Sequence, residues 1–197
     1  MTKEKFEKLW KINYPNTVPI SYLFKNDYSE RWFRIHSLPE SKRYPENEKE
    51  WKILLSRQNE IITDLFEIDT PILIVTGEYN WGNDRTSHIT KEELVFKNYD
   101  FVELDKIDLF EIESEQYDEI DIYRPAFAET NWNIAKQKDL IKEIANDRIR
   151  AFFVSFEKNI IVAPYDGGID FVLKDVETKK YYKSKYQNWL SERKDGL

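Results

Sequence analysis

The segment AFFVSFEKNIIVAPYDGGIDFVL, residues 151–173, decides the fold more clearly than any other part of the chain. Its first two apolar runs are separated only by Glu157-Lys158-Asn159, a spacing that is typical of an antiparallel hairpin. Asn tolerates the left-handed backbone conformation that such a turn needs. A second turn at residues 164–168 leads into a third apolar run. The sequence therefore predicts a three-stranded antiparallel meander.

A helix is predicted directly after this meander. Asp175 is placed to cap its first turn, and Asp195-Gly196 marks the expected end, since Gly is favoured just past a helix. Its apolar stripe holds four side chains, Tyr182, Tyr186, Trp189 and Leu190. We expect this stripe to pack on the meander and to bury Trp189.

Three further helices are expected at residues 3–12, 48–66 and 134–147. The second is the clearest, because Asn47 is a good cap and apolar residues recur every three or four positions after it. Asn133 is the expected cap of the third.

Strands are expected at residues 31–36, 71–75 and 120–123, with one or two more between 94 and 119, whereas residues 80–92 are expected to form a loop. The run 71–75 is continuously apolar, which is typical of a central strand covered on both faces and compatible with parallel pairing. The predicted fold class is α+β or mixed α/β, a layered sheet with helices packed on it. A single domain is expected over residues 1–197, with residues 1–20 forming an N-terminal helix and arm.

The composition excludes several classes of function. The chain has 197 residues, no cysteine and a formal net charge of −7, so disulfides, thiolate nucleophiles and a general nucleic-acid-binding face are not expected. Gly77 and Gly82 have the first spacing of a phosphate loop, but Asn83-Asp84 stands where that loop needs Lys and Ser or Thr. His36 and His88 are too far apart in sequence for a helical metal-binding pair. We therefore expect no cofactor and no metal.

The first residues lack the apolar stretch of a signal peptide, and no apolar run reaches the length needed to span a membrane. A cytoplasmic location without membrane association is the resulting expectation. Oligomeric state is left open by the sequence.

Two pairs of stretches resemble a known family. One pair is RIHSLPESKRY at residues 34–44 with Arg57-Gln58-Asn59, and the other is APYDGGID at residues 163–170 with YQNWLSER at residues 186–193. They are similar to the bacterial family catalogued as domain of unknown function 3885, and the likeness extends over residues 21–197. The resemblance implies a bacterial origin and a Rossmann-like sheet with helices. It implies no catalytic residue.

A cluster of basic residues is the first candidate site. Although the chain is acidic overall, the basic side chains of residues 31–43 and the loop amides beside them could hold a carboxylate or a phosphate. The candidate anion-binding residues are Arg31, Arg34, His36, Ser37, Lys42 and Arg43, with Ser41 nearby. We expect Arg34 and His36 to share one cleft near the start of the 48–66 helix. The structural alternative is that Arg34 pairs with Glu40 or an acid of residues 103–121 and that His36 caps a strand end.

The turn that holds Asp166 and Asp170 is the second candidate. Two carboxylates beside Gly167-Gly168 could bind Mg²⁺ weakly or act as an acid–base pair. Ordinary turn chemistry is the simpler interpretation, because Asp accepts backbone hydrogen bonds and Gly tolerates positive φ.

The acidic stretch 103–121 is the third candidate. Acids alternate there with apolar residues, a pattern typical of a solvated strand face or a protected sheet edge. The same pattern could present a docking surface for a basic protein. The candidate partner-binding residues are Glu113, Glu115, Asp118, Glu119 and Asp121.

Two functional hypotheses follow, and the sequence does not decide whether the protein is an enzyme. The preferred one is a non-catalytic, immunity-like or inhibitor-like domain that binds a basic protein through its acidic face. The alternative is a small hydrolase or transferase that acts on an anionic ligand through Arg34, His36 and Asp166.

Overall fold

The computed structural model describes residues 1–81, 85–86 and 94–191. Within this part the strands form one sheet of nine, and every pair is antiparallel. The spatial order is β1 (Trp32–His36), β9 (Gly168–Val172), β8 (Ile160–Pro164), β7 (Ala151–Ser155), β2 (Pro71–Trp81), β6 (Asp121–Asn131) and β4 (Val102–Glu103), with β3 (Arg85–Thr86) on β2 and β5 (Ile107–Asp108) on β6. The predicted fold class, a layered α+β sheet with helices packed on it, is confirmed, whereas the Rossmann-like sheet that the resemblance implied is not found, because every strand pair in the described part is antiparallel.

The predicted meander is confirmed as β7, β8 and β9. Val154 pairs with Ile161 across the first hairpin, and Ile161 pairs in turn with Val172. Asn159 has a φ of 51°, the left-handed conformation expected for it in the turn.

Strand β2 lies at the centre of the sheet but is longer than its apolar run predicts. It continues past Val75 to Trp81, so the expectation that a loop begins at residue 80 is wrong. Of the expected loop, residues 82–84 and 87–92 lie outside the described part. Both faces of β2 are buried as expected, with Ile74 in one core cluster and Val75 in another. Helices on both sides of an antiparallel sheet explain the apolar run without parallel pairing.

Gly77 and Pro125 face each other where the long β2–β6 ribbon bends past the meander. A side chain at Gly77 would overlap the ring of Tyr123. Pro125 has no N–H to donate, and it lies between the short partners of β6, because β4 pairs at Phe127 and β5 at Tyr123. Pro125, which cannot donate a backbone hydrogen bond, therefore lies between the positions of β6 that pair with β4 and with β5.

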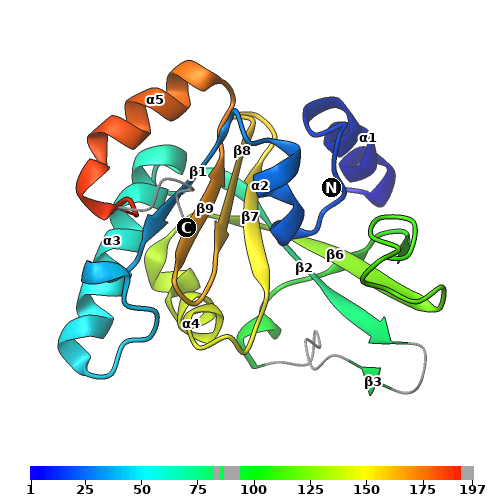
Figure 1. Cartoon of the computed structure of the whole chain (residues 1–197), viewed down its shortest axis with the longest axis horizontal. Helices are drawn as coiled ribbons and strands as arrows, with labels where there is room; N and C mark the ends of the chain where they lie inside the picture. Colours follow the sequence, from blue (N-terminus) through cyan, green and yellow to red (C-terminus); the bar gives the residue numbers. More distant parts are fainter. Residues whose placement is uncertain (82–84, 87–93, 192–197) are drawn as a thin grey trace.

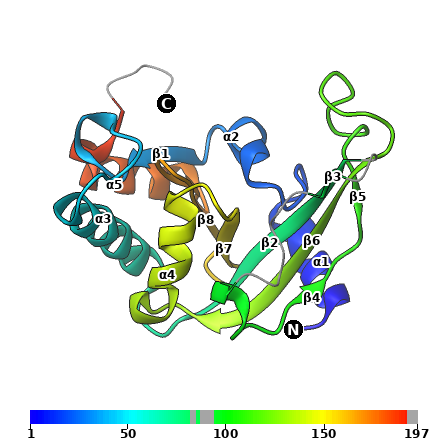
Figure 2. The ribbon, with the colours of Figure 1, turned by 90° about the horizontal axis from the view of Figure 1, so that it is seen from below.

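Helices cover both faces of the sheet (Figures 1 and 2). On one side lie α3 (Glu48–Phe66) and α4 (Ile134–Ala145), and on the other lie α1 (Lys3–Asn13) and the short α2 (Phe24–Asp27). The α3/α4 side encloses the larger core cluster, and the α1/α2 side is packed mainly by aromatic rings. Short 3-10 turns occur at Ser21–Leu23, Pro39–Ser41, Leu94–Phe96 and Gln187–Trp189. Among the described residues, no helix is both long and apolar enough to cross a membrane.

The helix ends follow the predicted caps with one exception. Asn47 accepts a hydrogen bond from the Glu50 amide at 3.0 Å, and Asp175 caps α5 (Val176–Lys185) through the Thr178 amide at 2.7 Å. However, α5 ends at Lys185, well before the expected stop at residues 195–196, which lie outside the described residues.

The expected burial of Trp189 is also wrong. Its ring is half-buried, whereas Tyr186, which directly follows α5, is 4% exposed and belongs to the core. Hydrogen bonds tie this part of the chain to α3, because Tyr182 of α5 and Tyr186 after it both donate to Asp64, and both rings contact the core cluster that includes residues of the meander.

Candidate functional site

Strands β1 and β9 bring two of the candidate sites together. Arg34 lies opposite Asp170 in the ladder, and its Nε and Nη2 donate to the two carboxylate oxygens at 2.5 and 2.8 Å. The guanidinium also lies 4.4 Å from the centre of the Tyr165 ring. Burial by itself lowers the pKa of Arg34, but the hydrogen bonds and charge of Asp170 outweigh it and the pKa is raised. The structural alternative expected Arg34 to pair with Glu40 or with an acid of residues 103–121. That expectation is wrong, because the partner is Asp170.

Asp166 in the β8–β9 turn is engaged in the same way. It is 4% exposed, forms an ion pair with Arg43 and accepts a hydrogen bond from the Tyr44 hydroxyl at 2.7 Å. The hydrogen bond to Asp166 raises the pKa of both Arg43 and Tyr44. No group of three metal-ligating side chains occurs among the residues that the structure describes.

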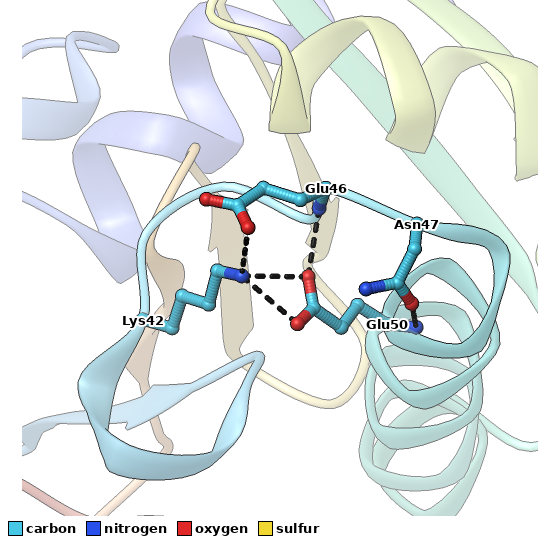
Figure 3. Close-up of polar contacts among 4 residues, drawn as sticks. All are labelled: Lys42, Glu46, Asn47 and Glu50. Atoms are coloured by element: carbon cyan, nitrogen blue, oxygen red, sulfur yellow. Dashed lines mark hydrogen bonds and ion pairs between the residues drawn. The ribbon is translucent and has the colours of Figure 1, made fainter.

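Lys42 helps to hold the loop that leads into α3 (Figure 3). Its Nζ lies 2.9 Å from both carboxylate oxygens of Glu50 and 3.0 Å from Glu46. Glu50 also accepts the Glu46 amide at 2.7 Å. These bonds fix the loop before Asn47 and leave Lys42 with its charge already balanced.

Two more members of the basic cluster serve the fold. Arg31 donates to the Lys174 carbonyl at 3.2 Å and lies 4.6 Å from the Tyr28 ring centre. Ser37 is fully buried, and its hydroxyl accepts a hydrogen bond from Gln58 of α3 at 2.8 Å. The structure therefore does not gather the six candidate residues into one anion pocket.

His36 instead lines a cleft of about 610 Å³ beside the edge strand β1. The other walls are residues 38–41, Arg57 of α3 and residues 188–191. Arg57 donates to the His36 carbonyl at 3.1 Å and lies 5.3 Å from the Trp189 ring centre. Burial lowers the pKa of Arg57, and among the described residues no carboxylate is within ion-pairing distance of it.

The imidazole of His36 is 8% exposed, and its Nε2 is buried without a hydrogen-bond partner among the described residues. Burial lowers its pKa, the nearby charges of Arg34 and Arg57 lower it further, and a hydrogen bond with the Gly167 backbone opposes them. The ring is therefore neutral near pH 7. In a neutral imidazole one ring nitrogen donates a hydrogen bond and the other accepts one, so Nε2 can take a partner of either kind.

Arg34, Arg43, Asp166 and Asp170 line a different cavity, of about 310 Å³, together with tyrosines of β2, β6 and the β8–β9 turn. The expectation that Arg34 and His36 share one cleft is thus wrong. Although both side chains lie on the same face of β1, the Asp170 bridge holds Arg34 towards β9, and His36 is at the strand end.

The acidic stretch lies at the β6 edge of the sheet. Of its candidate residues, Glu113 accepts a hydrogen bond from the Tyr22 hydroxyl at 3.0 Å, and buried Asp121 accepts the Asp118 amide at 2.9 Å. The side chains of Glu115, Asp118 and Glu119 are exposed, and among the described residues no Lys or Arg forms an ion pair with them. Figure 2 shows residues 109–120, hereafter the acidic loop, projecting beyond the end of the β2–β6 ribbon.

These features define an α+β protein with a helix-covered antiparallel sheet, a polar cleft at one edge and an acidic loop at the other. The chain belongs to the family described as Domain of unknown function (DUF3885), whose sequence model matches residues 20–194. No curated protein and no solved structure matched the chain.

Sequence reasoning missed Arg57 and Trp189 as lining residues of the cleft. Both lie in the stretches that carry the family resemblance, Arg57-Gln58-Asn59 and YQNWLSER. Those stretches, together with residues 36–41, meet in one place only after α3 and the chain following α5 pack beside β1. The signal was present in the sequence, but spacing alone could not bring the three segments together.

Proposed function

We propose that this protein is a non-catalytic, cytoplasmic bacterial protein that binds a basic protein partner through the acidic loop. The observation that carries the proposal is that exposed apolar side chains and acids without an ion-pair partner among the described residues occur together on an anchored loop. Phe110 is 36% and Ile120 is 55% exposed, and Glu115, Asp118 and Glu119 lie between them in sequence. Apolar anchors supply binding energy, and the charges around them select a cationic partner.

The loop is held in place by its own buried residues. Leu109 is fully buried and Tyr117 nearly so, and both pack in a small core cluster with Tyr79 and Tyr123. The Tyr117 hydroxyl donates to Tyr22 at 3.1 Å. Because these contacts order the loop before any partner arrives, binding costs little conformational entropy.

The catalytic alternative has weaker support in the geometry. Arg34 and Asp166 are each paired with an opposite charge, and neither lines the cleft that contains His36. The three residues therefore do not present one reacting constellation. Their roles in binding β1 to β9 and in closing the turn account for their positions.

Charge reversal tests the proposal. The variant E115K/D118K/E119K is compared with E60K/D139K/E157K, which reverses three exposed acids on other elements. Both variants move the formal charge from −7 by six units, to −1, so the control removes any effect of net charge alone.

Wild-type protein and both variants are immobilised and exposed to an extract of the source cells at low and high salt. We expect wild type and the control to retain the same protein of high isoelectric point, with retention falling as salt rises, and the loop variant to lose it. Equal retention by the loop variant and the control would refute the proposal.

A further inference from the structure

The cleft beside β1 contains two polar groups that the fold leaves without their usual partners. Arg57 is half-buried, and its guanidinium is held by one backbone carbonyl and the Trp189 ring, with no carboxylate opposite it among the described residues. His36 lines the same cleft, and its Nε2 is buried with no hydrogen-bond partner in the part of the chain that the structure describes. Burying a cation or a polar nitrogen without a partner is unfavourable, so a ligand that satisfies both would be stabilised there.

We propose that this cleft binds a small phosphate-bearing molecule, with Arg57 anchoring the anion and Nε2 of His36 forming a hydrogen bond with one of its oxygens. Arg has several N–H donors in a planar fork that matches an oxyanion, and only one of them is used by the His36 carbonyl. This site goes beyond the proposed function, because the cleft and the acidic loop share no residue.

A phosphate can satisfy His36 whichever ring nitrogen carries the proton. Among the described residues Nε2 has no partner, and in the neutral ring it is either a donor or an acceptor. A phosphate group has several oxygens that accept hydrogen bonds, and inorganic phosphate near pH 7 also has an O–H to donate. Phosphate can therefore contact Arg57 and His36 together.

The size and walls of the cleft indicate that the phosphate belongs to a larger molecule. The volume of about 610 Å³ lies within the range of small-molecule sites. Trp189 offers a half-buried aromatic surface, and Asn188 offers an amide for the remainder of the ligand. Glu40 is the acid among the lining residues; it is exposed, so water screens its repulsion of the anion.

Residues 38–41, which form one wall of the cleft, include two residues in an uncommon backbone conformation. Glu40 and Ser41 are consecutive non-glycine residues with φ of 56° and 55°. Such conformations are rare outside glycine and persist where the surroundings impose them. This geometry accompanies the two unpartnered groups and does not carry the proposal alone.

Imidazole nitrogen NMR tests the proposal directly, because the chain has only two histidines. An H88Q background leaves His36 as the one imidazole signal. Inorganic phosphate is the probe, and sodium chloride at matched ionic strength is the comparison. We expect phosphate to shift the His36 Nε2 resonance saturably at pH 7 and chloride to give no saturable shift, because chloride lacks the several oxygens that a phosphate offers to both side chains.

Variants assign the anchor. R57Q is expected to weaken phosphate binding by about tenfold or more, whereas R124Q, which removes an exposed arginine from β6, leaves it unchanged. E40Q is expected to strengthen binding about twofold by removing a repulsive charge. If R57Q does not fold, the phosphate and chloride titrations of the H88Q chain still decide the matter.

The proposal is overturned if phosphate gives no saturable shift up to about 10 mM, or if R57Q and R124Q weaken binding equally. A saturable shift of the same size with sodium chloride would also overturn it. None of these outcomes depends on the acidic loop, so failure here is distinguishable from failure of the proposed function.

Discussion

Replacing Asp170 with Asn is expected to destabilise the protein by leaving Arg34 without its counter-charge. The two side chains form a two-bond bridge between β1 and β9 and are only 17% and 11% exposed. The amide of Asn keeps the shape of the carboxylate but cannot balance the guanidinium. The edge strand β1 keeps its backbone pairing with β9 but loses this side-chain ion pair.

The size of the stability loss in D170N depends on how well the surroundings stabilise the charge of the unpaired Arg34. Breaking a fully buried ion pair costs about 3–5 kcal/mol. Arg34 borders an open cavity and keeps the Tyr165 ring at 4.4 Å, so part of its charge remains stabilised. We expect a loss of about 2 kcal/mol, which in a chain of this length lowers Tm by roughly 4–8 °C.

Urea unfolding followed by circular dichroism measures the loss, and a double-mutant cycle with R34M isolates the pair. We expect a coupling energy of about 1.5–2 kcal/mol between the two positions. R34M/D170L is expected to be more stable than D170N, because two apolar side chains leave no unpaired charge. A cost below about 0.5 kcal/mol for D170N, or a coupling energy near zero, would refute the view that this bridge is structural.

Three further predictions concern the same edge of the sheet. Trp189→Ala is expected to cost roughly 1–2 kcal/mol, less than the 3–5 of a fully buried ring, since Trp189 is only half-buried; a larger loss in urea unfolding would show that the ring is core. Gly168→Ala is expected to cost about 2–3 kcal/mol, because a Cβ there overlaps the Ile35 carbonyl oxygen of β1, and an unchanged urea midpoint would contradict that close approach. The lowered pKa of His36 means that the unfolded chain takes up a proton first as pH falls below about 6.5, so stability declines there; H36Q should flatten this decline between about pH 6.5 and 5.5, and an unaltered pH profile would show that His36 is not buried neutral.

The helices were predictable where a cap and an apolar stripe agree. For residues 48–66 Asn47 fixes the start and the stripe fixes the buried face, so prediction and structure coincide. For the last helix the cap at Asp175 was correct, but its end was not. The aromatic spacing continues past Lys185, and the chain leaves the helix because Tyr186 turns into the core against α3, a tertiary contact that spacing does not report.

Strand β2 shows why a length can be underestimated. Gly77 looks like the end of an apolar run, yet Tyr79 and Trp81 continue the strand in alternation. The glycine is needed there because the Tyr123 ring occupies the space of a Cβ. A glycine inside a strand marks a close approach as often as it marks an end.

The candidate residues were identified from the sequence, but their partners were not. Arg34 and Asp170 are far apart in the chain and face each other only once the register of β1 and β9 is set. The same holds for Arg43 and Asp166. Charges that look available in the sequence are therefore paired in the fold, while Arg57 has no ion-pair partner among the described residues.

Photo-crosslinking from the acidic loop tests the central claim most directly. Benzoylphenylalanine is placed at Phe110, and the control carries it at Tyr181, which is 60% exposed on α5. The proposed docking surface predicts that position 110 crosslinks in cells to one protein of high isoelectric point, and that E115K/D118K/E119K removes the adduct. No adduct at position 110, or the same adduct at position 181, would contradict it.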